Sequence, residues 1–275
     1  MISSSINDRL SLNYLIRDYL NCEEIVELEN VFPGFITVRT SSSRLPGKCL
    51  LPFGDETVIE HVINRAKNSG IFPIVCTSKD KSDDELENIA IKLGVACYRG
   101  SLNNKIKRWV DCAECFNISA FHAIDADDPF FDGSRAVESL LKLKAGSLDV
   151  VYPPESSSAG AASVGFSFTK NILQKAIHGL TPDTDTEMAW YFLEKIEGLK
   201  SDILIDNEAK EASNIRLTLD YEEDYWLLAS LARILGNNVS RQDIIKFFRK
   251  NPDFTKINLF RNTEWKASQN AWPSR

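Results

Sequence analysis

The sequence lacks a long hydrophobic run, an excess of basic residues and a secretory signal. No apolar stretch reaches the roughly 18 residues that a membrane-spanning helix needs, so we predict no membrane span. Asp and Glu number 39 against 32 Lys and Arg, and the net charge of −7 argues against a broad nucleic-acid-binding face. The first eight residues show no basic region followed by an apolar core, and we expect a cytoplasmic protein.

Cysteine and histidine are also scarce. Six cysteines in 275 residues do not make a disulfide framework, which fits a reducing compartment. Cys112 and Cys115 form a C-x-x-C within a helical pattern, but no second Cys or His pair follows at zinc spacing. A zinc or redox site is therefore not predicted, and packing is the preferred interpretation of the three widely separated histidines.

What is present is an alternation of apolar, β-branched runs with amphipathic segments. This order, with short links, predicts an α/β fold with a doubly wound, mostly parallel sheet. The length suffices for one sizeable domain, either alone or with a small appendage. Strands are expected near 35–38, 72–77, 95–100, 120–125, 149–152, 164–168 and 215–220, with a short strand and turn at 48–55. Helices are expected near 57–69, 82–93, 105–116, 134–144, 169–178, 185–195, 222–235 and 241–250.

The chain divides into three parts in this interpretation. Residues 1–33 form an N-terminal extension with an amphipathic helix at 8–20, and residues 34–260 form the main domain. Residues 261–275 are expected to be an irregular tail. Within the main domain, the small-residue loop at 156–163 is either a linker or a loop that covers substrate. The segment of about 152–212 that contains it is the candidate acceptor-binding and dimerisation region.

The most distinctive stretch runs from Phe35 to Lys48. It begins as a buried strand and ends in hydroxyl residues and three cations, Arg39, Arg44 and Lys48. Ligands of α/β proteins gather at the carboxyl ends of strands, and phosphates bind guanidinium groups, lysines and backbone N–H groups. A phosphate-binding loop is the favoured interpretation, and a solvated loop is the alternative. A P-loop is excluded because Ser42, Pro46 and Cys49 occupy positions where that motif requires other residues.

Two acids at expected strand ends, Asp127 and Asp220, could complete a site with these cations. Magnesium takes oxygen ligands and often needs only one or two carboxylates beside the phosphates of a substrate. Either acid alone could equally be a helix cap or a turn residue. Their joint arrangement with the cations favours a metal–triphosphate site.

Four stretches resemble the sugar-acid cytidylyltransferases, which include the acylneuraminate and ketodeoxyoctonate cytidylyltransferases and the spore-coat polysaccharide protein F group. Val38–Lys48 resembles the signature A-R-x-x-S-T-R-L-P-x-K, and Leu93–Ser101 resembles E-L-G-V-x-x-x-R-G-S. Asp125–Asp132 resembles T-G-D-C-P-L-I-D, and Leu217–Asp224 resembles L-T-V-D-T-P-E-D. The matches span roughly residues 34–235.

The resemblance implies a Rossmann-like fold of the nucleotide-diphospho-sugar transferase (GT-A-like) type. The implied reaction is magnesium-dependent transfer of CMP from CTP to a sugar acid or a sugar phosphate, with release of pyrophosphate, for surface polysaccharide synthesis. The oligomeric state is left open, with the helix at 8–20 and the aromatic helix at 187–193 as candidate surfaces of a homodimer. The implied roles are triphosphate binding by Arg39, Arg44 and Lys48, nucleotide contacts by Ser42, Ser43, Arg99 and Ser101, and Mg²⁺ ligation by Asp127 and Asp220.

This chain also departs from the family pattern. Ala126 replaces the glycine before the metal aspartate, and Leu102–Trp109 stands where the spore-coat group has E-D-D-V-L-D-R-Y. Only Glu187 survives of an E-H-V-T-P segment, so the acceptor is not assigned. Two alternatives follow: a glycosyltransferase that uses Asp125-Ala126-Asp127 as a D-x-D metal motif, or a non-catalytic nucleotide-binding module.

Overall fold

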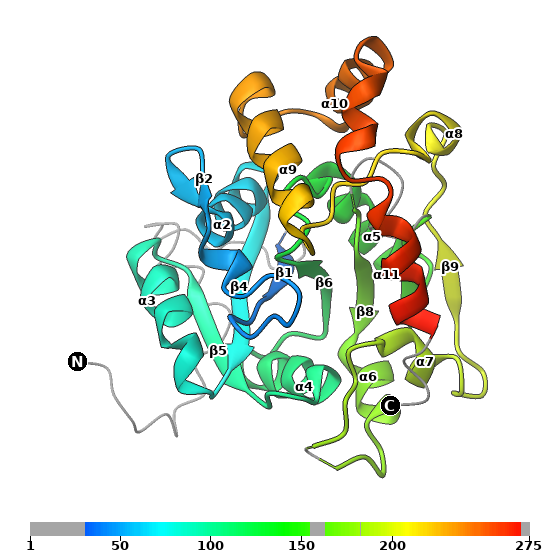
Figure 1. Cartoon of the computed structure of the whole chain (residues 1–275). Helices are drawn as coiled ribbons and strands as arrows, with labels where there is room; N and C mark the ends of the chain where they lie inside the picture. Colours follow the sequence, from blue (N-terminus) through cyan, green and yellow to red (C-terminus); the bar gives the residue numbers. More distant parts are fainter. Residues whose placement is uncertain (1–30, 155–162, 182, 271–275) are drawn as a thin grey trace, which may run out of the picture.

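A seven-stranded sheet forms the centre of the computed structural model, which describes residues 31–154, 163–181 and 183–270 (Figure 1). Its strands lie in the order β5-β4-β1-β6-β8-β7-β9. The ladders are parallel except those that β8 makes with β6 and β7, so β8 alone runs against the others. The predicted mostly parallel sheet is confirmed. The strands are β1 (Phe32–Thr37), β4 (Ile71–Ser78), β5 (Ala96–Gly100), β6 (Ala120–Asp125), β7 (Val150–Tyr152), β8 (Phe166–Thr169) and β9 (Ser201–Ile203).

Helices cover both faces of the sheet, because neighbouring strand residues point to opposite sides. Phe35 and Phe121 face one layer, whereas Ile36 and Ile124 face the other. The first layer holds α4 (Lys105–Cys115), α6 (Lys170–Ala176) and α7 (Ala189–Leu193). The second holds α2 (Val58–Asn68), α3 (Asp84–Lys92) and α5 (Gly133–Ala145).

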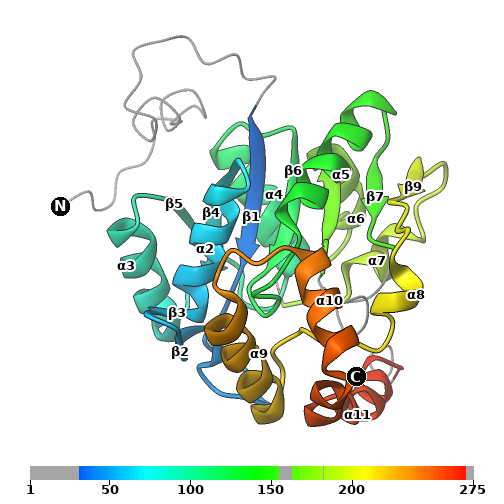
Figure 2. The ribbon, with the colours of Figure 1, turned by 90° about the horizontal axis from the view of Figure 1, so that it is seen from above.

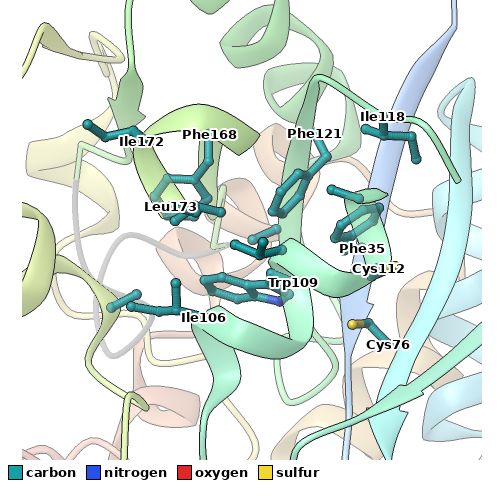
Figure 3. Packing of buried hydrophobic residues seen from close by; sticks show 14 of the residues in the cluster. Phe35, Cys76, Ile106, Trp109, Cys112, Ile118, Phe121, Phe168, Ile172 and Leu173 are labelled. Carbon is teal, nitrogen blue, oxygen red and sulfur yellow. The ribbon is translucent and has the colours of Figure 1, made fainter. Parts of the chain in front are cut away.

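Aromatic rings fill the core beneath α4 (Figure 3). Phe35 stacks on Phe121 with 3.9 Å between ring centroids, and Trp109 lies 5.5 Å from Phe168. The Trp109 indole N–H donates to Thr37 Oγ1 at 2.9 Å, which satisfies its one polar atom. Cys112 is buried in the same cluster, so this half of the C-x-x-C packs as a small apolar side chain.

The C-terminal part differs from the sequence-based prediction. Residues 215–220 are extended but belong to no strand, because their apolar side chains pack against α9 (Glu222–Leu235) and α10 (Arg241–Lys250). The predicted irregular tail is wrong for Arg261–Asn270, which form α11. Arg261 at its start is bound to Glu223 of α9, and Figure 2 shows α9, α10 and α11 gathered together. The short helix η4 (Pro252–Ile257) links α10 to α11.

Several smaller expectations are corrected or lie outside the described residues. The helix expected at 185–195 is only α7, since the chain before it is hydrogen-bonded to the start of α4. We call residues 39–48, which carry Arg39, Arg44 and Lys48, the cation loop. In place of the strand expected after it, the chain forms a short helix η2 (Lys48–Leu50) and a hairpin of β2 (Pro52–Phe53) and β3 (Glu56–Thr57). The helix at 8–20 and most of the loop at 156–163 lie outside the described residues. The remaining short elements are η3 (Lys81–Asp83) and α8 (Ala209–Ala212).

None of the helices in the described part of the chain has the length and apolarity to cross a lipid bilayer.

Candidate active site

The loop that follows β1 folds back over the carboxyl end of the sheet. Asp83, which is buried, accepts hydrogen bonds from Thr40 N at 2.8 Å and Thr40 Oγ1 at 2.7 Å, and it also binds Thr77 and Ser78 at the end of β4. Gly47 has φ of +65°, a conformation that favours glycine, and its N–H donates to Thr40 O. This reversal brings Lys48 back toward the strand ends.

The loop and the strand ends enclose a cavity of about 450 Å³. All three predicted phosphate-binding cations line it, together with Ser42 and Ser43. Asp127 lines it as well, whereas Asp220 reaches it through the contacts described next. The other lining residues are Thr37, Val38, Ser41, Cys49, Asp125, Ala126, Asp185, Glu187 and Met188.

Lys48 lies between the two predicted metal ligands. Its Nζ donates to Asp127 Oδ2 at 2.9 Å, to Asp220 Oδ1 at 3.0 Å and to Leu219 O at 2.7 Å. Burial alone would lower the pKa of this ammonium, but the charges of Asp127 and Asp220 outweigh burial and raise the pKa above the ordinary lysine value. Lys48 is therefore fully charged in this arrangement.

Asp220 is held on both sides. One oxygen accepts from Arg44 at 2.7 Å as well as from Lys48, and the other lies 3.4 Å from Arg216 Nη2. Its backbone N–H donates to Asp224 Oδ2 at 3.0 Å. Leu219 N donates to Asp127 O at 2.6 Å, which fixes the extended segment beside the end of β6. Asp220 therefore reaches the site without belonging to a sheet strand.

Asp127 belongs to an acidic cluster. One carboxylate oxygen from each of Asp125, Asp127 and Asp128 lies within 4.8 Å of the others. Burial, followed by the charges of Asp127 and Asp125, raises the pKa of Asp128, and its Oδ1 has no hydrogen-bond partner among the described residues. Burial also raises the pKa of Asp125, against the opposing charge of Lys105. A cation would relieve this concentration of negative charge.

A second ionic network joins three residues of the cavity lining, Arg39, Asp125 and Glu187, through Lys105. Glu187 lies 3.2 Å from Arg39 through one oxygen and 3.2 Å from Lys105 through the other. Lys105 also contacts Asp125 at 3.2 Å, and Arg39 donates to Leu102 O at 2.7 Å. The charge of Lys105, against burial and together with Arg39, lowers the pKa of Glu187 to about 2. Glu187 is therefore an anion near neutral pH.

Two predicted nucleotide-binding residues lie outside the cavity lining. Arg99 turns toward α3, where its guanidinium contacts Glu87 and Asp84 and donates to the carbonyls of Ser78 and Asp80. Ser101 accepts a hydrogen bond from Asn104 N at the start of α4. In this structure both residues shape the edge of the sheet next to the cavity.

Sequence reasoning assigned no role to Lys105 and Asp185, and it gave Asp125 a role only in the glycosyltransferase alternative. Lys105 is nearly buried beneath the cavity, where the spore-coat pattern has valine, and Asp125 stands where the family pattern has threonine. Both departures are visible in the sequence and carry opposite charges, but only the fold shows that the two residues pair. Glu187 was visible only as the surviving residue of an otherwise altered segment.

The amino-acid sequence was compared with known protein families and with individual proteins. A family profile described as "Cytidylyltransferase" matches residues 34–224. The chain is 26% identical to the spore coat polysaccharide biosynthesis protein SpsF of Bacillus subtilis, over 79% of this chain and 94% of that protein. It is 30% identical to an uncharacterized protein of Methanocaldococcus jannaschii, over 82% of this chain and 93% of that protein.

A solved structure, a cytidylyltransferase from Leptospira borgpetersenii, has the same fold. It superposes with a TM-score of 0.70 and 28% identity, over 82% of this chain and 96% of that one. The matched family region includes the cation loop, the acidic cluster and Asp220. The family profile thus covers the loop, the acids and most of the sheet that positions them. The chain belongs to the cytidylyltransferase family.

Proposed function

We propose that this enzyme transfers CMP from CTP to a sugar acid, or a related sugar phosphate, with Mg²⁺ and release of pyrophosphate. One observation carries the proposal: Arg39, Arg44 and Lys48, all from one loop, line one cavity, where Lys48 contacts both Asp127 and Asp220 and Arg44 contacts Asp220. Three fixed cations suit a triphosphate, and two carboxylates beside them suit a hard divalent cation.

The residues fit a divalent metal. Asp127 and Asp220 direct oxygens at the same ammonium, so both carboxylates face one position, and Asp128 adds a buried oxygen without a partner among the described residues. An all-oxygen set of this kind suits Mg²⁺. We propose Asp127 and Asp220 as its ligands. When bound, the metal supplies charge neutralisation and Lewis acidity at the phosphates.

The chain's own residues do the remaining work by position and charge. In the proposed reaction an acceptor oxygen attacks the α-phosphorus of CTP, and the bond from that phosphorus to the bridging oxygen of pyrophosphate breaks. Lys48 and Arg44 neutralise the charge that develops on pyrophosphate, and Arg39 orients the phosphates. Ser42 and Ser43 line the same cavity and are proposed as further phosphate or ribose contacts. No covalent intermediate is needed.

The acceptor is proposed to bind against the wall that carries Asp185, Glu187 and Met188. This wall is fixed to the start of α4, because Thr186 Oγ1 accepts from Ile106 N at 2.9 Å and binds Asn104. It belongs to the 152–212 segment, for which we propose the acceptor role. SpsF is named for spore coat polysaccharide biosynthesis, and a polysaccharide precursor is the corresponding proposal for the product here.

A homodimer through the same segment is a further proposal. Four large apolar side chains there are exposed: Trp190, Tyr191, Ile203 and Ile205, the last to 72%. Exposed apolar groups on one segment are typical of protein contacts. Sedimentation equilibrium of the full chain should give a dimer mass, and the variant Ile203→Lys with Ile205→Lys should give a monomer. A monomeric wild type at micromolar concentration contradicts this assembly.

The deciding experiment measures pyrophosphate release from CTP with Mg²⁺ and a panel of sugar acids and sugar phosphates. Turnover that depends on both CTP and an acceptor supports the proposal. Release of CMP or UDP from nucleotide sugars instead would identify a glycosyltransferase. Tight CTP binding without turnover on any acceptor would identify a non-catalytic module.

A further inference from the structure

The three donors of the Lys48 ammonium are matched by three oxygens. An ammonium group has three N–H bonds and no acceptor. Its partners here are Asp127 Oδ2, Asp220 Oδ1 and Leu219 O, all between 2.7 and 3.0 Å. A phosphate can therefore bind Lys48 only if at least one of these contacts is given up.

The same three oxygens resemble the surroundings of a small hard cation. Two carboxylates and one backbone carbonyl, delivered by two separate segments, are ligands that divalent cations take in proteins. The two carboxylates are also the proposed metal ligands. The ammonium and a metal ion therefore compete for the same oxygens, and their like charges oppose joint occupation.

Arg44 reinforces this competition. Its guanidinium contacts the same oxygen of Asp220 that accepts from Lys48, at 2.7 Å. Two of the three proposed triphosphate-binding cations are thus held by the proposed metal ligands. The side chain of Lys48 is 14% exposed and that of Arg44 is 34% exposed, so both lie next to the cavity where phosphates would enter.

We infer that Lys48 acts as an internal substitute for the metal ion, so that metal and triphosphate each strengthen the binding of the other. Without nucleotide the ammonium neutralises Asp127 and Asp220 and weakens metal binding. A triphosphate draws Lys48 and Arg44 to its oxygens and releases both carboxylates to the metal. Because coupling between two ligands is reciprocal, the metal favours triphosphate binding by the same factor. This inference rests on the proposed function, in that it takes Asp127 and Asp220 as metal ligands.

The test is a Mn²⁺ titration of the full-length protein, in which free Mn²⁺ is followed by electron paramagnetic resonance and no nucleotide is present. Lys48→Met should bind Mn²⁺ more tightly than the wild type, by roughly tenfold or more, since site couplings of 5- to 150-fold are typical. Lys105→Met is the matched control. It removes another largely buried lysine, 7% exposed against 14% for Lys48, which contacts Asp125 and Glu187 but neither proposed metal ligand. Its Mn²⁺ affinity should therefore change by less than about threefold.

A second titration with CTP, and no acceptor, measures the coupling itself. CTP should tighten Mn²⁺ binding to the wild type by a larger factor than it does in Lys48→Met. The affinity of CTP for Mn²⁺ in solution is the same for both proteins and cancels from the comparison. Lys48→Gln removes the charge but keeps a donor and should behave as Lys48→Met does, which provides a second variant if the first does not fold.

Unchanged or weaker Mn²⁺ binding in both Lys48 variants would overturn the inference. A rise in Lys105→Met alone would also overturn it, because the metal would then lie at Asp125. These readouts do not require turnover, so they are separate from the test of the reaction. If the lysine variants respond as expected but no acceptor yields pyrophosphate, the inference holds and the proposed reaction fails.

Discussion

Asp224 offers the sharpest test of how the site is held. Five donors converge on its carboxylate: Arg216 through Nε and Nη2, the backbone N–H groups of Asp220 and Tyr221, and Asn258 Nδ2. The distances lie between 2.8 and 3.0 Å, and the side chains of Arg216 and Asp224 are both fully buried. Asp224→Asn removes the charge and replaces one acceptor oxygen with a donor.

The cost can be estimated from these contacts. Two donors point at Oδ1 and three at Oδ2, so the better amide orientation still leaves two buried donors unsatisfied. Each unsatisfied donor costs about 1–3 kcal/mol, and breaking a buried ion pair costs about 3–5 kcal/mol in total. We expect a loss of about 3–5 kcal/mol in unfolding free energy. For a protein of this size that lowers the melting temperature by roughly 6–20 °C.

Urea unfolding followed by circular dichroism measures the loss. The double variant Arg216→Met with Asp224→Asn should lose less than the sum of its single variants, by about 1–3 kcal/mol, because neither charge is then left alone. Asp253→Asn is the control, since its ion pair with Lys256 is exposed and the unfolding midpoint should barely move. A loss below about 1 kcal/mol in Asp224→Asn, or strict additivity in the double variant, would show that this buried pair does not support the fold as argued.

Three further predictions concern the site and the buried histidines. Lys48→Ala should weaken CTP binding far more than CMP binding in isothermal titration calorimetry, and equal weakening of the two would refute a role at the leaving phosphates. Asp127→Asn should lower the rate of metal-dependent pyrophosphate release at least about a hundredfold, which is the usual loss of rate when one group that stabilises transition-state charge is removed. An unchanged rate would remove Asp127 from the site. Burial lowers the pKa of both His61 and His122 to about 4, so both are neutral in the folded chain at neutral pH and below it. The unfolded chain binds protons at the ordinary value of 6.5, so stability should be full above that pH and should fall as the pH drops from 6.5 to 4, by up to about 1.4 kcal/mol per pH unit for each histidine. Urea unfolding across this range measures the slope, and His122→Gln should roughly halve it.

Local patterns predicted most of the sheet, and they singled out the cation loop and Asp127, which line the cavity. The apolar run before Arg39 forms β1, and the run that ends at Asp125 forms β6. These two strands are parallel neighbours in the sheet. The cation loop could be predicted because its three charges lie within one stretch of ten residues, 39–48, after a single strand. Asp127 could be predicted in the same way, since it directly follows β6.

The parts that sequence reasoning missed depend on contacts between distant residues. Ile215–Asp220 has the alternating pattern of a strand, but its apolar side chains meet α9 and α10 rather than a neighbouring strand. The pairing of Lys105 with Asp125 and Glu187 joins residues 20 and 82 positions apart, which no local pattern reports. The helix in the predicted tail, α11, begins at Arg261, which is bound to Glu223 on α9, a partner that only the tertiary fold brings near.

The support behind Asp220 extends past the end of the matched family region at residue 224. Asn258 donates both to Arg216 O and to Asp224, and Arg216 in turn donates to Asn262 at 3.0 Å in α11. Side chains from the last described helix therefore complete the scaffold of a carboxylate that faces the cavity. The limit of sequence similarity is thus not the limit of the cooperative unit. A chain cut at the family boundary would keep every proposed ligand and lose part of what orients one of them.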